Sequence, residues 1–152
     1  MPKEFYKGKA IVAFTLCIKD RLPIFSDPEI VKVFTDILTE ITKKYKCLIP
    51  AFCFMPDHQH IVITGTDDEV DLLKVASSYK QKTGFWMTKN KIGAKWQKDF
   101  YDHVLKKEES LTPAIRYILD NPVRKGIVSD WQEYAFKGAI GCDLEDILTG
   151  IV

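Results

Sequence analysis

The sequence lacks features that would direct it to a membrane or cross-link it covalently. Its 152 residues contain no apolar run that approaches the length of a membrane span, and no basic stretch followed by an apolar one resembles a signal peptide. The four cysteines have no CxxC spacing, so we expect reduced thiols that serve mostly in packing. Internal repeats and low-complexity linkers are missing too. These absences predict a single cytoplasmic domain with enough apolar residues for a core.

A large overall charge is also absent, but the net charge of +1 hides an uneven distribution. Residues 74–107 contain nine lysines and only two acids, Asp99 and Asp102, whereas acidic residues gather at 67–71 and near the C-terminus. The basic segment also carries aromatic residues, which suits a phosphate backbone and stacked bases. A solvated helix face above core aromatics would give the same pattern, so the charge leaves both interpretations open.

Only three histidines are present, and two of them stand together. His58 and His60 lie between the apolar runs 49–55 and 61–63. In an extended strand, side chains two apart point to the same face, so the imidazoles should be neighbours while Gln59 turns away into the sheet. Neutral imidazole is a favoured ligand of divalent transition metals, and the pair is therefore half of a metal site. A solvated surface pair is the alternative.

Hydrophobic periodicity predicts the element order β-α-β-β-α-β, followed by one more helix. Strands are expected at 9–19, 47–55, 58–64 and 95–105, and helices at 28–45 and 70–89, with Gly84 permitting a kink in the second. The last helix should begin at Ser110 and end before Pro122, and the chain beyond it should be irregular apart from a short helix at 143–148. This is the α+β, ferredoxin-like (RRM-like) plan: an antiparallel four-stranded sheet with helices on one face and the last helix over the other.

That last helix carries a phenol and a carboxamide on one edge. Tyr117 and Asn121 are four residues apart and so share a helix face, from which they could face the histidine pair across the sheet. The phenol is then a candidate nucleophile, and the amide oxygen a candidate third metal ligand. A tyrosine that only packs against the sheet is the competing interpretation.

Four segments in this order resemble a known family of DNA-processing enzymes. They are Phe54-Met55-Pro56-Asp57-His58-Gln59-His60, then Lys80-Gln81-Lys82-Thr83-Gly84, then residues 96–104 (WQKDFYDHV), and finally residues 116–126 (RYILDNPVRKG). Together they resemble the IS200-like single-tyrosine HUH transposases, and within that group most of all the REP-associated tyrosine transposases. The resemblance covers about residues 10–128 of one domain and leaves 129–152 as a C-terminal tail. Gln59 departs from it, since the family usually has a hydrophobic residue there.

The resemblance implies a metal-dependent single-stranded DNA endonuclease and strand transferase. Tyr117 would be the catalytic nucleophile that forms a 5′-phosphotyrosine intermediate, and His58, His60 and Asn121 would bind Mg²⁺ or Mn²⁺. His103 would approach the metal or a phosphate, unless it is a strand histidine hydrogen-bonded within the fold. Contacts to DNA are expected from basic and imidazole side chains: Lys80, Lys82, Lys95, Lys98, His103, Arg116, Arg124 and Lys125.

The implied partner is single-stranded DNA beside a folded hairpin, either REP-like or the end of an insertion sequence. Such a partner would place the protein in the cytoplasm, associated with the nucleoid. It could act as a monomer or as a homodimer. Two other functions stay open: a non-catalytic single-stranded nucleic-acid-binding module of the same ferredoxin-like plan, although the RNP1 pattern of aromatics is absent, and a small metal-dependent hydrolase in which Tyr117 merely packs.

Overall fold

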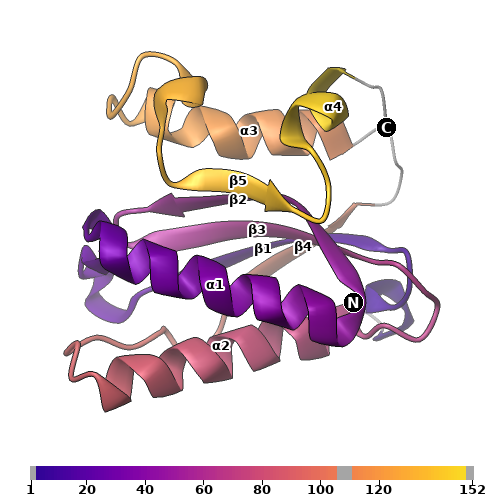
Figure 1. Ribbon diagram of the computed structural model, residues 1–152, viewed down its shortest axis with the longest axis horizontal. Coiled ribbons are helices and arrows are strands. Elements are labelled where there is room, and N and C mark those ends of the chain that lie inside the picture. The colour runs from indigo at the N-terminus through magenta and orange to yellow at the C-terminus, as the bar shows by residue number, and fades with distance from the viewer. Residues whose placement is uncertain (1–2, 106–110, 150–152) are drawn as a thin grey trace.

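A five-stranded antiparallel sheet lies between two layers of helices in the computed structural model, which describes residues 3–105 and 111–149 (Figure 1). The strand order is β4-β1-β3-β2-β5. The bounds are β1 Ile11–Cys17, β2 Cys47–Met55, β3 His58–Gly65, β4 Tyr101–Leu105 and β5 Lys137–Ile140. The first four strands confirm the ferredoxin-like plan that the sequence predicts, and the fifth adds to the free edge of β2.

Helices cover both faces of this sheet, as Figure 1 shows. On one face lie α1 (Pro28–Tyr45) and α2 (Leu72–Lys89), and on the other α3 (Leu111–Arg124) and α4 (Leu144–Thr149). Short 3₁₀ turns occur at η1 (Lys3–Tyr6), η2 (Lys19–Arg21), η3 (Ile24–Ser26) and η5 (Trp131–Glu133). Within the described ranges, none of the helices has the length and apolar character needed to span a bilayer.

The two long helices begin where the sequence supplies a side-chain cap. The Asp27 carboxylate accepts a hydrogen bond from the backbone N–H of Glu29, with Pro28 in the first helical turn, and the helix starts at 28 as predicted. Asp71 caps α2 in the same way, slightly later than the acidic run 67–69 suggested. Helix α2 then continues without a break through Gly84, because its flanking turns are anchored by buried residues such as Tyr79 and Met87.

Strand alternation divides the hydrophobic residues into two cores. One lies between the sheet and α1 and α2, and contains Phe14, Phe34 and Phe54. The smaller one lies under α3 and α4, and contains Val62 and Ile118 together with the tail residues Tyr134, Ile147 and Leu148. Helices and hydrophobic packing therefore cover both faces of the sheet.

Two boundaries differ clearly from the sequence prediction. Strand β4 begins at Tyr101 rather than at 95, because Trp96 makes only an isolated bridge to Ile18 and its indole N–H donates to the Thr83 hydroxyl (2.8 Å). Helix α3 runs through Pro122 to Arg124, and its last carbonyls still find partners: the N–H of Lys125 donates to Asn121 and that of Ile127 to Pro122. The proline costs one hydrogen bond but does not end the helix.

Strand β5 was not predicted at all, because its four residues show no hydrophobic alternation. It forms through its partner: the N–H of Phe54 donates to the carbonyl of Phe136 (2.8 Å), and Gly138 lies directly against the Phe52 ring, where a Cβ would come within 3.1 Å. The Tyr134 hydroxyl also donates to the Phe54 carbonyl. The predicted short helix is present as α4, so the tail packs back onto the sheet.

Candidate metal and nucleophile site

His58 and His60 lie at the start of β3, on the sheet face that α3 covers. Their ring centroids are 5.0 Å apart and the rings are nearly perpendicular (89°). Antiparallel pairing places Thr15 of β1 opposite His60. Gln59 points to the opposite face, where it is fully buried and its amide oxygen accepts a hydrogen bond from the Tyr79 hydroxyl. The strand thus presents two imidazoles side by side, as its alternation predicts.

Each imidazole has a hydrogen-bond partner at Nδ1 that restrains the orientation of its ring. The Nδ1 of His58 lies 2.7 Å from a carboxylate oxygen of Asp57, and the Nδ1 of His60 lies 3.0 Å from the hydroxyl of Thr15. An ionised carboxylate only accepts, so the His58 Nδ1 carries the proton and donates it. Metal-binding histidines are held in this way in many proteins, with the other ring nitrogen left to the metal. With its proton on Nδ1, His58 keeps the lone pair of Nε2 available for a metal ion, and His60 turns its own Nε2 toward Asn121 of α3.

Asn121 reaches the same place from α3. Its side chain is largely buried (8% exposed) and its amide nitrogen lies 3.0 Å from Nε2 of His60. A half-turn of the carboxamide about its last bond would present the oxygen instead. Among the described residues, no group of three or more His, Cys, Asp or Glu side chains is arranged to hold a metal. The Asn121 amide is the side chain that these residues place against the imidazole nitrogen of His60, which makes it the candidate third ligand.

His60 is suited to bind a cation because it stays neutral. Burial lowers its pKa to about 4, and the nearby His58 and Arg124 lower it in the same direction. At neutral pH no proton competes for Nε2. Two imidazole nitrogens and one amide oxygen form a donor set that accepts Mn²⁺ readily and Mg²⁺ through its remaining water ligands, so the residues present fit a divalent ion.

Tyr117 stands one helical turn before Asn121 and is largely exposed (66%). Arg124 holds it from about two turns further along α3: its guanidinium carbon lies 4.2 Å from the centre of the phenol ring, and one of its N–H groups donates to the Tyr117 carbonyl (3.1 Å). Asp120 accepts from the same guanidinium (3.1 Å). The tyrosine does not pack against the core, and its ring is fixed beside a cation.

A cleft of about 470 Å³ opens between α3 and the β4 side of the sheet. Its lining includes His60, Tyr117, His103 and Tyr101. The sequence analysis missed Tyr101 as a site residue, although it is 70% exposed and faces Thr15 across the strands. The signal was present, because Tyr101 and His103 are two apart on one strand and must share a face. The cleft therefore offers two phenols near one histidine pair.

The predicted DNA-binding residues fall into two groups. Lys125 lines a second cleft with His58, and Arg124 lies next to Tyr117, so these two are at the site. Four lysines belong instead to α2 and to the loop after it, on the other side of the sheet: Lys80, Lys82, Lys95 and Lys98.

Two of the predicted contacts are occupied within the protein. The ammonium of Lys80 donates to the Lys98 carbonyl and lies 5.6 Å from the centre of the Phe100 ring. Arg116 donates to the carbonyl of Leu148 in α4 (3.3 Å). These side chains connect parts of the fold, which the charge pattern of the sequence could not reveal.

The fold and the arrangement of α3 over the strands agree with the comparison to known proteins. The family model described as "Transposase IS200 like" matches residues 7–121, and the chain belongs to this family of transposases.

Individual relatives agree with this assignment. The chain is 24% identical over 156 residues to a candidate REP-associated tyrosine transposase of Haemophilus influenzae, covering 93% of this chain and 88% of that protein. Among solved structures, it superposes with a TM-score of 0.73 and 17% identity on a REP-associated tyrosine transposase bound to a REP hairpin, over 90% of this chain and 81% of the other. A candidate transposase of Deinococcus radiodurans R1 gives a TM-score of 0.51 with 19% identity, over 73% and 88%.

Proposed function

We propose that this transposase cuts and rejoins single-stranded DNA beside a hairpin, with Tyr117 as the nucleophile. The observation that carries the proposal is the placement of α3: Asn121 meets His60 at 3.0 Å while Tyr117, one turn earlier, opens into the cleft that His60 also lines. A solved relative is bound to a REP hairpin, which supports a hairpin-flanked substrate for this chain.

His58, His60 and Asn121 would hold a divalent cation, Mg²⁺ or Mn²⁺. When bound, such an ion supplies positive charge that stabilises a phosphate in the transition state. The protein's own contribution is orientation: Asp57 and Thr15 fix the two rings, and the low pKa of His60 keeps its nitrogen unprotonated.

Tyr117 would attack the scissile phosphorus with its phenolic oxygen after losing its proton to solvent. The new Tyr–O–P bond replaces the bond from phosphorus to the 3′ oxygen, which leaves as a hydroxyl once it is protonated. The 5′ end remains linked to the protein, and a 3′ hydroxyl from another strand can reverse the step without ATP. Arg124 beside the ring would hold the phenol in place throughout.

The direct test is formation of a covalent protein–DNA adduct. Labelled oligonucleotides that carry a hairpin with single-stranded flanks are incubated with Mn²⁺ and resolved on a denaturing gel. We expect an adduct that disappears in Tyr117→Phe and after addition of EDTA, and that persists in Tyr101→Phe, which removes the other exposed phenol of the cleft.

Any of three results would contradict the proposal. Loss of the adduct only in Tyr101→Phe would reassign the nucleophile. Intact DNA binding without any adduct would favour a non-catalytic binding module, and cleavage that survives Tyr117→Phe would favour a metal-dependent hydrolase.

A further inference from the structure

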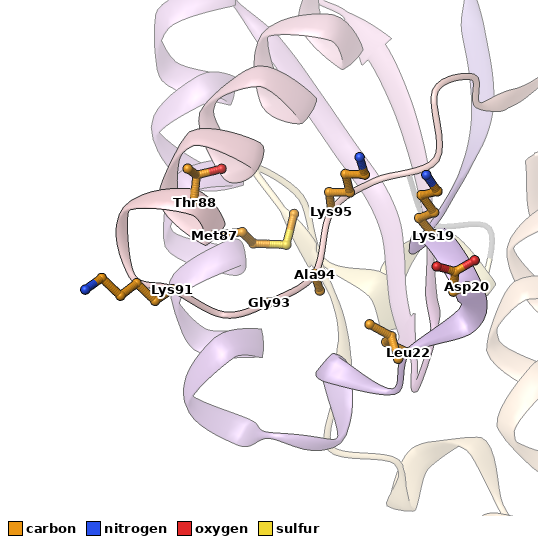
Figure 2. A pocket seen from close by; sticks show the side chains of 9 residues that line it. All are labelled: Lys19, Asp20, Leu22, Met87, Thr88, Lys91, Gly93, Ala94 and Lys95. Carbon is orange, nitrogen blue, oxygen red and sulfur yellow. The ribbon is translucent and has the colours of Figure 1, made fainter.

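Two clefts meet at the end of the sheet where β1 finishes and β3 begins. The turn of residues 19–23 forms the ridge between them. Lys19, Asp20 and Leu22 line the first cleft, of about 350 Å³, together with the end of α2 and the loop after it (Figure 2). Arg21 and Pro23 line the second, of about 400 Å³, which also contains His58. The ridge thus connects the histidine pair with a second depression outside the site described above.

The backbone of this ridge is strained. Asp20 and Arg21 are consecutive non-glycine residues in the left-handed region, with φ of 60° and 56°. Side chains with a Cβ rarely adopt this conformation. Such strain persists only where surrounding contacts impose it, and it is concentrated at binding sites in proteins.

Contacts from two segments, the turn at Asp57 and the loop at Lys95, hold the ridge in this conformation. The N–H of Ile18 donates to the Asp57 carbonyl (2.9 Å), and that of Lys19 donates to the Lys95 carbonyl (2.8 Å). The guanidinium of Arg21 lies 3.6 Å from the Asp57 carboxylate, which is itself bonded to His58. The ridge is therefore fixed relative to both the histidine pair and the loop that carries Lys95.

The first cleft is basic at its rim and apolar at its base. Its lining includes three ammonium groups, Lys19, Lys91 and Lys95, and a single carboxylate, Asp20. In Figure 2 the side chains of Lys19 and Lys95 extend in the same direction from adjacent segments, while Lys91 lies on the opposite rim. Met87, Leu22 and Ala94 supply the apolar surface, and Leu22 is 41% exposed.

From these features we infer that the Lys19–Lys91–Lys95 cleft binds consecutive phosphates of the single strand that continues from the scissile position at His58. The inference rests on the proposed function and extends it to the path of the substrate. The excess of positive charge matches a phosphate backbone. The apolar base suits unpaired nucleobases, which a duplex would keep stacked inside its helix, and so the occupant is the single-stranded flank rather than the hairpin stem.

The test is a scan in which single phosphates of a hairpin oligonucleotide are replaced by uncharged methylphosphonates. Binding to the full chain is measured in EDTA, so that no cleavage occurs. We expect the affinity of the wild type to fall when a methylphosphonate stands at any of a few adjacent positions of the flank. Replacements in the stem should cause no loss of affinity that depends on this cleft. In Lys19→Gln/Lys95→Gln the same replacements should have no further effect, because the charges that they contact are gone.

Salt dependence gives a second, quantitative readout. Each lost contact to a single-stranded phosphate lowers the slope of log affinity against log salt by about 0.7, so the double variant should lose about 1.4. Lys43→Gln is the matched control: it removes an exposed lysine from the last turn of α1, at the opposite end of the sheet, and should keep the wild-type slope.

The outcomes separate this inference from the proposed function. Suppose that Tyr117 forms the adduct, but the double variant keeps the wild-type salt slope and the wild-type sensitivity to methylphosphonates. This result would overturn the inference and leave the proposed function intact. Sensitivity that maps to the stem would assign the cleft to the hairpin and also overturn it. Absence of an adduct with the expected flank sensitivity would leave a phosphate-binding cleft in a protein that does not cleave.

Discussion

The amide nitrogen of Asn121 lies 3.0 Å from Nε2 of His60, although 61 residues separate the two in the sequence. This contact joins α3 to the centre of the sheet and occupies the nitrogen that a metal would take. Because the carboxamide can turn its oxygen to the same position, the structure contains a hydrogen bond that a cation can replace with little movement of the backbone.

Thr15 should matter for metal affinity without touching the metal. Its hydroxyl lies 3.0 Å from Nδ1 of His60 and restrains the orientation of the ring. In Thr15→Val, which preserves the shape of the side chain, we expect Mn²⁺ affinity to fall about tenfold or more, as is typical when such a partner is lost. Calorimetric titration measures this. Thr64→Val, at the far end of the same sheet, should bind as the wild type does, and equal affinities for the two variants would refute the role of Thr15.

The buried His60 should make the metal-free protein less stable in mild acid. Its pKa is about 4 when folded, against 6.5 for an ordinary histidine. Between these values the unfolded chain binds a proton that the folded protein does not, so the free energy of unfolding falls as the pH drops from 6.5 to 4. By linkage the loss approaches about 3 kcal/mol.

Urea unfolding in EDTA at several pH values measures this loss. His60→Gln removes the group that titrates. Between pH 6.5 and 4 its free energy of unfolding should therefore fall by about 3 kcal/mol less than that of the wild type. Parallel profiles for the two proteins would show that His60 is not held neutral by the fold.

Arg124 should affect the chemical step more than DNA binding. Its planar guanidinium both covers the Tyr117 ring and donates to the Tyr117 carbonyl and to Asp120, which an ammonium cannot reproduce. We expect Arg124→Lys to slow adduct formation by about tenfold, within the range of a cation–π contact, at nearly unchanged affinity. A rate equal to that of the wild type under saturating DNA would show that the ring needs no such support.

Gln59 and Tyr79 form a buried polar pair that is only half satisfied. The Tyr79 hydroxyl donates to the Gln59 oxygen, but the amide nitrogen of Gln59 has no partner among the residues described. Tyr79→Phe should cost about 1–3 kcal/mol, because it leaves the whole amide unpaired. The double variant Gln59→Leu/Tyr79→Phe should regain this loss, as measured by urea unfolding. A double variant less stable than Tyr79→Phe would contradict the argument.

The elements with strong local signals could be predicted from the sequence. Hydrophobic periodicity located α1, whose start carries the Asp27 cap, and the alternation around His58 and His60 predicted that the two rings share a face. The order of strands followed from these elements and from the ferredoxin-like plan. Their positions depend on residues close in sequence, which is why a single sequence was sufficient.

What depends on distant contacts could not be predicted. Strand β5 exists because the edge of β2 accepts it, and Lys80 turns inward because the Lys98 carbonyl and the Phe100 ring receive its ammonium. The ridge of residues 19–23 is joined to the loop of Lys95 by a tertiary hydrogen bond from the backbone N–H of Lys19. The lysine-rich segment indicated a charge, but not the face of the molecule on which that charge lies.

The pairing of β5 with β2 has a consequence for any shortened form of the chain. Removal of the residues after 128 would take away β5, Tyr134 and α4, which cover the β2 backbone and part of the second core. The bare β2 edge, nine residues long and rich in apolar side chains, would then be a template for pairing with other molecules. A truncated protein would therefore be expected to aggregate, and the tail protects the sheet from self-association.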